Sequence, residues 1–184
     1  VVGGEAKKVL ADGQALLKKA IDGRWLTANA VVALYPANSV NDDDIAFYTD
    51  ESRTDVALTW HGLRQQTEKQ EFVDADGQTK LRPSRCLADF VAPKNVPHLG
   101  ADYAGLFAVT AGIGAEKRAE AFEDAHDDYS AIMLKAIADR LAEAFAEALH
   151  HRVRTDLWGY AADEALSNED LIAEKYKGIR PAPG

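Results

Sequence analysis

Cysteine is nearly absent from this sequence of 184 residues: Cys86 is the single example. One cysteine can form no intrachain disulfide and cannot build a thiolate metal cluster from this chain alone. The chain also lacks any apolar run near the roughly 20 residues that a membrane-spanning helix needs. Its N-terminus lacks the positive-then-apolar pattern of a signal peptide. We therefore expect a cytoplasmic protein with no membrane partner.

Basic residues are in deficit, with 21 Lys and Arg against 30 Asp and Glu and a formal net charge of -9. A surface of this sign repels nucleic-acid phosphates, so no nucleic-acid partner is expected. Hydrophobic residues make up 47% of the chain and occur along its whole length, which predicts one compact domain with its own core. The sequence opens on Val1-Val2-Gly3-Gly4 and stops at Pro181-Ala182-Pro183-Gly184, so we expect residues 1–184 to be one domain of a larger protein, truncated at both ends.

Several common site signatures are missing. Gly112-Ile113-Gly114 lacks the third glycine of a dinucleotide fingerprint and the lysine of a P-loop. No nucleophile and base occur at a recognisable spacing, which argues against a small-molecule hydrolase. His150-His151 would point about 100° apart on a helix, so we expect surface histidines and no shared metal. Asp42-Asp43-Asp44 lacks the ligand spacing of a calcium loop and is predicted to be a solvated turn.

Hydrophobic periodicity predicts an α+β fold in which helices flank a set of antiparallel strands. Apolar residues spaced three or four apart predict a helix over 5–21 and either one long helix over 116–153 or two helices joined near His126. A short helix should begin at a cap formed by Ser167 or Asn168. Strands are predicted at 30–35, closed by Pro36, and at 44–49, 54–61 and 105–113, with a polar stretch over 63–85 that contains a loop at 74–78.

Two groups of residues are candidates for ligand binding. Arg140, Glu143 and Glu147 share one strip of the predicted long helix, which either faces a cleft or forms a surface ladder of ion pairs; the spacing alone favours the ladder. Arg180 precedes Pro181-Ala182-Pro183, whose two prolines stiffen the backbone. An arginine on a rigid segment can present its planar fork to a carboxylate, and Gly184 would let a ligand approach the backbone closely.

Three parts of the sequence resemble the C-terminal activation, or reactivation, domain of cobalamin-dependent methionine synthase. They are FYTDESR at 47–53 with LRQQ at 63–66; SRCLADFVAP at 84–93; and a long run with AHDDY at 125–129, ADRLAEAF at 138–145, WGY at 158–160 and GIRPAPG at 178–184. The resemblance covers essentially the whole chain. It implies a C-shaped α+β domain built on a twisted antiparallel sheet flanked by helices, with S-adenosylmethionine bound in a shallow groove on the inner face.

The resemblance also implies site residues. The family's Arg-x-x-x-Gly motif places the methionine end of the cofactor at Arg180, with backbone contacts from Ala182 and Gly184. Glu143 and Glu174 match family positions that line or support the groove. The family motif continues with a tyrosine after the glycine, beyond the last residue of this sequence.

The implied function is the rescue of oxidised cobalamin by one electron and the methyl group of S-adenosylmethionine. The implied partners are the cobalamin-binding domain of the same enzyme and flavodoxin or an equivalent reductase. The chain would then be part of a methyltransferase, and we do not expect it to turn over alone. An alternative is a stand-alone interaction module that docks a cobalamin protein or a reductase without using S-adenosylmethionine.

Overall fold

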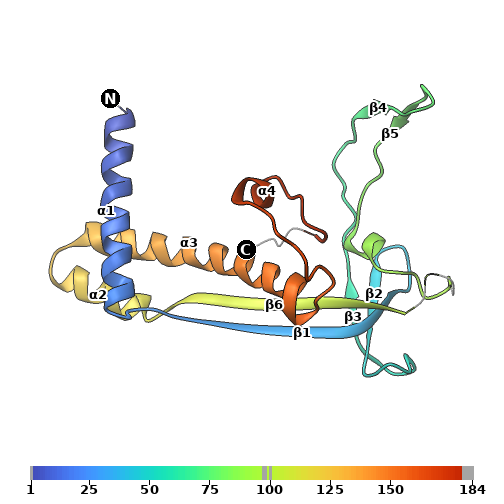
Figure 1. Ribbon diagram of the computed structural model, residues 1–184, viewed down its shortest axis with the longest axis horizontal. Helices are drawn as coiled ribbons and strands as arrows, with labels where there is room; N and C mark the ends of the chain where they lie inside the picture. Colours follow the sequence, from blue (N-terminus) through green and yellow to red (C-terminus); the bar gives the residue numbers. More distant parts are fainter. Residues whose placement is uncertain (1, 97–98, 100, 180–184) are drawn as a thin grey trace. The chain divides into compact units, whose positions relative to one another are not determined.

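The computed structural model describes residues 2–96, 99 and 101–179 (Figure 1). Its helices and strands are interspersed along the chain, and the α+β class predicted from the sequence is confirmed. The elements in order are α1 Val2–Asp22, β1 Thr27–Ser39, β2 Asp44–Tyr48, β3 Val56–His61, β4 Glu71–Val73, β5 Thr79–Leu81, the 3-10 turn η1 Leu87–Phe90, β6 Asp102–Ile113, α2 Ala115–Asp124, α3 Asp128–Arg152, the π-helical turn η3 Val153–Leu157 and α4 Asn168–Ile172.

The chain divides into two compact units. The first comprises Val1–Val31 and Phe107–Gly184, and the second comprises Val32–Leu106. Strands β1 and β6 each continue from one unit into the other along the chain. None of the helices in the described part of the chain is long and apolar enough to cross a membrane.

The helical unit is organised around α3, against which both α1 and α2 pack. Of the two alternatives for 116–153, the two joined helices are the ones observed: α2 ends at Asp124, and His126 in the connection has a left-handed φ of 59°. Asp127 then caps α3, its carboxylate accepting the Ser130 amide at 3.1 Å. The long apolar periodicity therefore belongs to two helices that form a hairpin.

The main sheet has the strand order β3-β2-β1-β6. Strands β1 and β2 pair antiparallel from Ala37 opposite Phe47 to Ser39 opposite Ile45, and β2 pairs antiparallel with β3. The prediction that Pro36 ends the first strand is wrong, because β1 runs on to Ser39. Proline lacks an amide donor, but Pro36 lies just before the first residue that pairs with β2, so this ladder does not require that donor.

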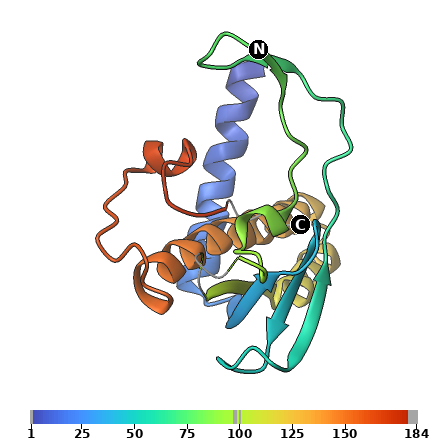
Figure 2. The ribbon, with the colours of Figure 1, turned by 90° about the vertical axis from the view of Figure 1, so that its right-hand side faces the viewer.

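A second, two-stranded sheet lies within the stretch that the sequence predicted only as polar. Strands β4 and β5 pair antiparallel and stand on two long connections away from the main sheet of their unit (Figure 2). The predicted loop at 74–78 is their turn, in which the Asp74 carboxylate accepts the amides of Asp76 at 3.0 Å and Gln78 at 2.9 Å. Three-residue strands with every position exposed carry too little hydrophobic alternation to be recognised from sequence.

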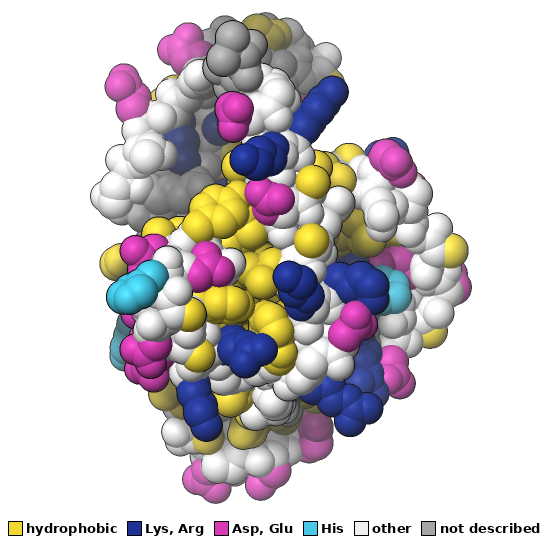
Figure 3. All heavy atoms as spheres, turned by 90° about the vertical axis from the view of Figure 1, so that its left-hand side faces the viewer, with side chains coloured by type: hydrophobic (Ala, Val, Ile, Leu, Met, Phe, Trp, Pro, Cys, Tyr) yellow, Lys and Arg dark blue, Asp and Glu magenta, His cyan; other side chains and the backbone are white. Residues whose placement is uncertain are grey.

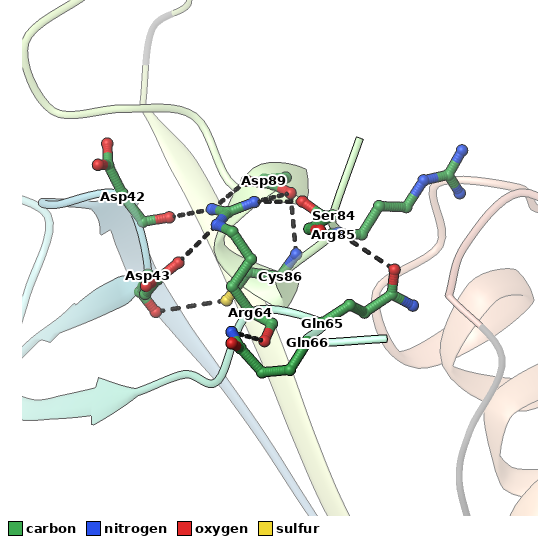
Figure 4. A network of polar contacts seen from close by, with 9 residues as sticks. All are labelled: Asp42, Asp43, Arg64, Gln65, Gln66, Ser84, Arg85, Cys86 and Asp89. Atoms are coloured by element: carbon green, nitrogen blue, oxygen red, sulfur yellow. Dashed lines mark hydrogen bonds and ion pairs between the residues drawn. The ribbon is translucent and has the colours of Figure 1, made fainter. Parts of the chain in front are cut away.

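The two connections to this hairpin are tied at their base by Arg64 (Figure 4). Its guanidinium donates to the Asp43 carboxylate and to both oxygens of Asp89, each at 2.8 Å, and to the Ser84 carbonyl. Asp89 also accepts the Cys86 amide at 2.9 Å. These bonds and the Arg64 charge lower the pKa of Asp89 to about 2. The network closes the loop that contains β4 and β5 above a small apolar core.

That core consists of residues from β1, β2 and the turn η1: Ala37, Ile45, Phe47, Cys86 and Ala88. The predicted turn at Asp42-Asp43-Asp44 is present, but two of its acids have side-chain partners. Asp43 pairs with Arg64, and Asp44 lies 2.9 Å from the His61 ring nitrogen. Within the part of the chain that the structure describes, no group of three or more His, Cys, Asp and Glu side chains is placed to hold a metal ion.

The Arg64 network predicts a pH-dependent contribution from Asp89. Because folding lowers the pKa of this carboxyl from 3.8 to about 2, its stabilising effect is complete above about pH 4 and is lost as the pH falls through 2. Asp89→Asn should therefore lower the urea midpoint of unfolding at pH 6, and the difference from wild type should shrink toward pH 2. Asp76→Asn, in the β4–β5 turn, is the control and should change little. A difference that stays constant across this pH range would contradict the assignment.

Candidate functional site

The candidate site is built at the C-terminal end of α3, where the helix changes its winding. Residues Val153–Leu157 form a π-helical turn, and the amides of Trp158 and Gly159 both bond to the Val153 carbonyl, at 2.9 and 3.2 Å. Gly159 has a φ of 77°, a left-handed conformation that favours glycine. Such turns are frequent at functional sites. Here the π-helical turn ends α3, and the chain reverses its direction after it.

Arg154 lies in this turn and is almost completely buried, with 1% of its side chain exposed. Its Nε donates to Glu164 Oε2 at 2.8 Å and its Nη2 donates to Glu164 Oε1 at 2.6 Å. Two parallel bonds of this kind fix both position and orientation of the guanidinium. Glu164 is 5% exposed, and the Arg154 guanidinium lowers its pKa. The pair therefore joins the end of α3 to the segment that follows.

The third nitrogen of the Arg154 guanidinium contacts His150. Arg154 Nη1 lies 2.7 Å from His150 Nδ1, and because arginine has no acceptor, the ring nitrogen must accept. This assigns a neutral ring with its proton on Nε2. Burial, together with the Arg154 charge, lowers the pKa of His150 to about 4.

The prediction that His150-His151 are surface histidines is therefore wrong for His150, which is 8% exposed. His151 is exposed, as predicted. The reason is that His150 and Arg154 are four residues apart on one face of the helix, beside the buried pair Leu149 and Val153. That spacing was a sequence signal for a buried polar pair, and the adjacency of the two histidines concealed it.

Tyr176 closes this cluster from the C-terminal segment. Its ring meets the His150 ring edge-on at a centroid distance of 5.2 Å, and the Arg154 guanidinium lies 4.3 Å from its centroid. Both contacts are favourable arrangements for an aromatic ring. Tyr176 is 9% exposed, so these contacts hold a segment with no long helix of its own against the end of α3.

The next two residues are held by Tyr160. Its hydroxyl donates to the Lys177 carbonyl at 2.9 Å. Gly178 has a φ of 140°, and a Cβ built there would lie 2.9 Å from the Tyr160 hydroxyl, so a larger residue would be strained in both backbone and packing. We call His150, Arg154, Tyr160, Glu164 and Tyr176 the C-terminal clamp. It fixes the backbone up to Gly178, two residues before Arg180.

Comparison with known proteins identifies the family. The sequence matches the vitamin B12 dependent methionine synthase activation domain over residues 1–184. This chain belongs to that family. A crystal structure of the MetH reactivation domain bound to AdoHcy is 54% identical in sequence, with a TM-score of 0.84, and the match covers 100% of this chain and 53% of that one. The chain thus spans about half the length of the solved reactivation domain that it matches.

The family resemblance and the activation-domain fold expected from the sequence are both confirmed by these matches. Of the five predicted site residues of this activation domain, Arg180, Ala182 and Gly184 lie outside the described residues. Their roles, like those of Glu143 and Glu174, stay predictions. The C-terminal clamp, which precedes Arg180 in the chain, was not identified from the sequence.

The two predicted acids lie on different elements. Glu143 is on α3, and its side chain, which is 43% exposed, pairs with Arg140 Nη1 at 2.9 Å. This i,i+3 pair has the ion pairing that the spacing of the predicted strip favours. Arg140 also pairs at 2.9 Å with its neighbour Asp139, which was not part of that strip. Glu174 follows α4 and has a left-handed φ of 56°, which for a glutamate is uncommon.

The same helical unit of the activation domain contains an apolar groove of about 750 Å³. It is lined mostly by aliphatic and aromatic side chains of α1, α3 and the adjoining ends of β1 and β6: Leu17, Ala20, Ile21, Arg24, Leu26, Thr27, Ala28, Ala111, Leu141, Ala144 and Phe145. Helix α1 also leaves Val9 and Leu10 more than half exposed. Figure 3 shows hydrophobic side chains gathered on one face of the molecule, with lysine and arginine side chains among them.

The clamp predicts a large contrast between two glutamates of the activation domain. Glu164→Gln leaves the buried Arg154 charge without its carboxylate and should lower the free energy of unfolding by about 3 kcal/mol. Glu143→Gln breaks an exposed ion pair and should cost less than about 1 kcal/mol. Urea denaturation of the two variants and the wild type measures both. Equal effects would show that the Arg154–Glu164 pair is not the buried anchor described here.

Proposed function

We propose that this chain is part of the S-adenosylmethionine-binding reactivation domain of a cobalamin-dependent methionine synthase. The observation that carries the proposal is the 54% identity, over the full chain, to a reactivation domain bound to AdoHcy. AdoHcy is what remains of S-adenosylmethionine after its methyl group has left. Similarity at this level over the whole of this chain supports the same ligand class here.

The chemistry of the candidate residues fits that ligand. The methionine end of S-adenosylmethionine carries a carboxylate and an ammonium group, and its sulfonium adds a second positive charge. Arg180 would bind the carboxylate through its planar fork, with backbone contacts from Ala182 and Gly184. Carboxylates such as Glu143 and Glu174 would favour the positive groups.

The role of the bound molecule would be to supply a methyl group for the reductive methylation of oxidised cobalamin, while a flavodoxin or equivalent reductase supplies the electron. Cobalamin would be carried by a neighbouring domain of the parent methyltransferase. The residues of this chain would contribute binding and orientation, since holding two reactants in a productive geometry is itself a large part of catalysis. Such a role needs no protein nucleophile, which accords with the lack of a nucleophile-base spacing in the sequence.

The proposal predicts the effect of Arg180→Ala in the full-length enzyme. Loss of the guanidinium should weaken S-adenosylmethionine binding at least about tenfold, because a charge-assisted bidentate contact is removed. Isothermal titration calorimetry measures this directly. Arg152→Ala is the matched control, since it removes an exposed arginine whose partner is Asp156 at 3.2 Å, and it should leave the affinity unchanged. Unchanged affinity in Arg180→Ala would remove this residue from the site, and no binding by the wild type would favour a docking module instead.

A further inference from the structure

The apolar groove of the helical unit is open in the part of the chain that the structure describes. Ile21 lines it from α1 and is 65% exposed, and Ala144 lines it from α3 and is exposed as well. Contiguous apolar surface on a folded protein commonly marks a place where another surface packs. The groove therefore has the character of one half of an interface.

Helix α1 also calls for a further packing surface. Among its described residues the buried side chains are Leu16 and Ala20, while residues 3–11 are all exposed, with Val9 at 52% and Leu10 at 62%. In Figure 1 this half of the helix extends beyond α3, which belongs to the same unit. Helices in proteins draw most of their stability from the packing of an apolar face, and two buried side chains are few for a helix of 21 residues.

The exposed apolar side chains of α1 form a stripe that runs into the groove. Leu10, Leu17 and Ile21 are spaced by seven and four residues, so they share one face of the helix. Leu17 and Ile21 are themselves part of the groove lining. Apolar residues at this spacing are what one helix presents to another when their side chains interdigitate. The stripe and the groove therefore form one continuous surface that suits a helix.

The remaining lining residues fit the same kind of occupant. The ends of β1 and β6 contribute the small side chains Thr27, Ala28 and Ala111, which allow another backbone to approach closely. Among the described residues that line the groove, Arg24 alone is charged. A carboxylate on the occupant would be favoured opposite this guanidinium.

The solved reactivation domain points to the source of the occupant. The match covers 100% of this chain but 53% of that one, so about half of that polypeptide has no counterpart in residues 1–184. A domain is built by burying the apolar face of one part of the chain against another part. The length of that domain thus supplies about as much polypeptide again to cover the groove, without a second copy or a separate protein.

We propose that the groove is the packing site of an amphipathic helix that the same polypeptide supplies from outside residues 1–184, with an acidic side chain opposite Arg24. The helix buries Ile21, Leu17 and Ala144, and it gives α1 the second packing surface that its exposed stripe calls for. This inference goes beyond the function proposed above, and it does not depend on S-adenosylmethionine binding.

Cysteine labelling of the purified full-length enzyme tests the cover. In Ile21→Cys the new thiol should react with iodoacetamide at least about tenfold more slowly in the native enzyme than in urea, because a covered thiol reacts only when the cover opens. Peptide mass spectrometry measures the rate at that position alone. Ile132→Cys is the matched control, since Ile132 is 69% exposed on α3 and does not line the groove. Its thiol should react at a rate close to that in urea. Ala144→Cys is a second probe of the groove, from its other helix.

Each alternative occupant gives a different result. A thiol at position 21 that reacts in the native enzyme as fast as in urea would show an open groove. Protection that is lost on dilution would assign the groove to a second copy, and protection that appears only after a reductase is added would assign it to a separate protein. Any of these three results overturns the proposal. None of them bears on S-adenosylmethionine affinity, which calorimetry measures separately.

The acidic contact with Arg24 is tested in the same assay. Adding Arg24→Gln to Ile21→Cys should speed labelling about threefold, because loss of an ion pair at the rim of the cover lets it open more often. Lys18→Gln is the control on the same helix: it removes an exposed pair with Asp22 at 2.7 Å and should leave the labelling rate unchanged. Equal rates in the two backgrounds would remove the acidic side chain from the proposal.

Discussion

Arg154 carries a full positive charge although only 1% of its side chain is exposed. The C-terminal part of the structure depends on the groups that neutralise this charge and accept its hydrogen bonds. Glu164 meets it with two hydrogen bonds, His150 accepts a third, and the Tyr176 ring covers the guanidinium. Removing Glu164 or His150 would leave a buried charge or donor unsatisfied, which costs far more than the intact arrangement gains. The cluster therefore holds its geometry tightly, and the segments that supply it are held with it.

Those segments come from three places in the sequence: the end of α3, the stretch that contains Glu164, and the residues after α4. Apart from the five-residue α4, little regular secondary structure follows η3 in the described part of the chain. Polar and aromatic side-chain contacts therefore hold the backbone of this segment in place, as hydrogen bonds within helices and sheets do elsewhere in the chain. A loop fixed in this way suits ligand binding, because its side chains can face a ligand while its backbone stays in place.

Much of the fold could be predicted from the sequence because its helices are long and amphipathic. A break near His126 and a cap at Ser167 were among the alternatives that local signals allowed, and both are present. The continuation of β1 through Pro36 could not be predicted from the sequence. A proline is tolerated in a strand where no neighbouring strand needs its amide donor, and that depends on how the strands pair. The β4–β5 hairpin was missed because its strands are short and every position in them is exposed, so no alternation of buried and exposed residues marks them.

The candidate site was predictable only in part, and for a different reason. Arg180 was found because a rigid proline segment next to an arginine is a local pattern, and the family resemblance strengthened it. The clamp was missed because its members lie as far apart as His150 and Tyr176, and their contacts depend on the π-helical turn that reverses the chain. Sequence periodicity does not reveal such a turn.

The most direct measurement is a crystal structure of the full-length enzyme with S-adenosylmethionine bound. We expect the Arg180 guanidinium to bond to the ligand carboxylate and the Tyr160 hydroxyl to remain bonded to the Lys177 carbonyl. A carboxylate held by other groups, or a Tyr160–Lys177 bond that is broken when the ligand is bound, would contradict this expectation.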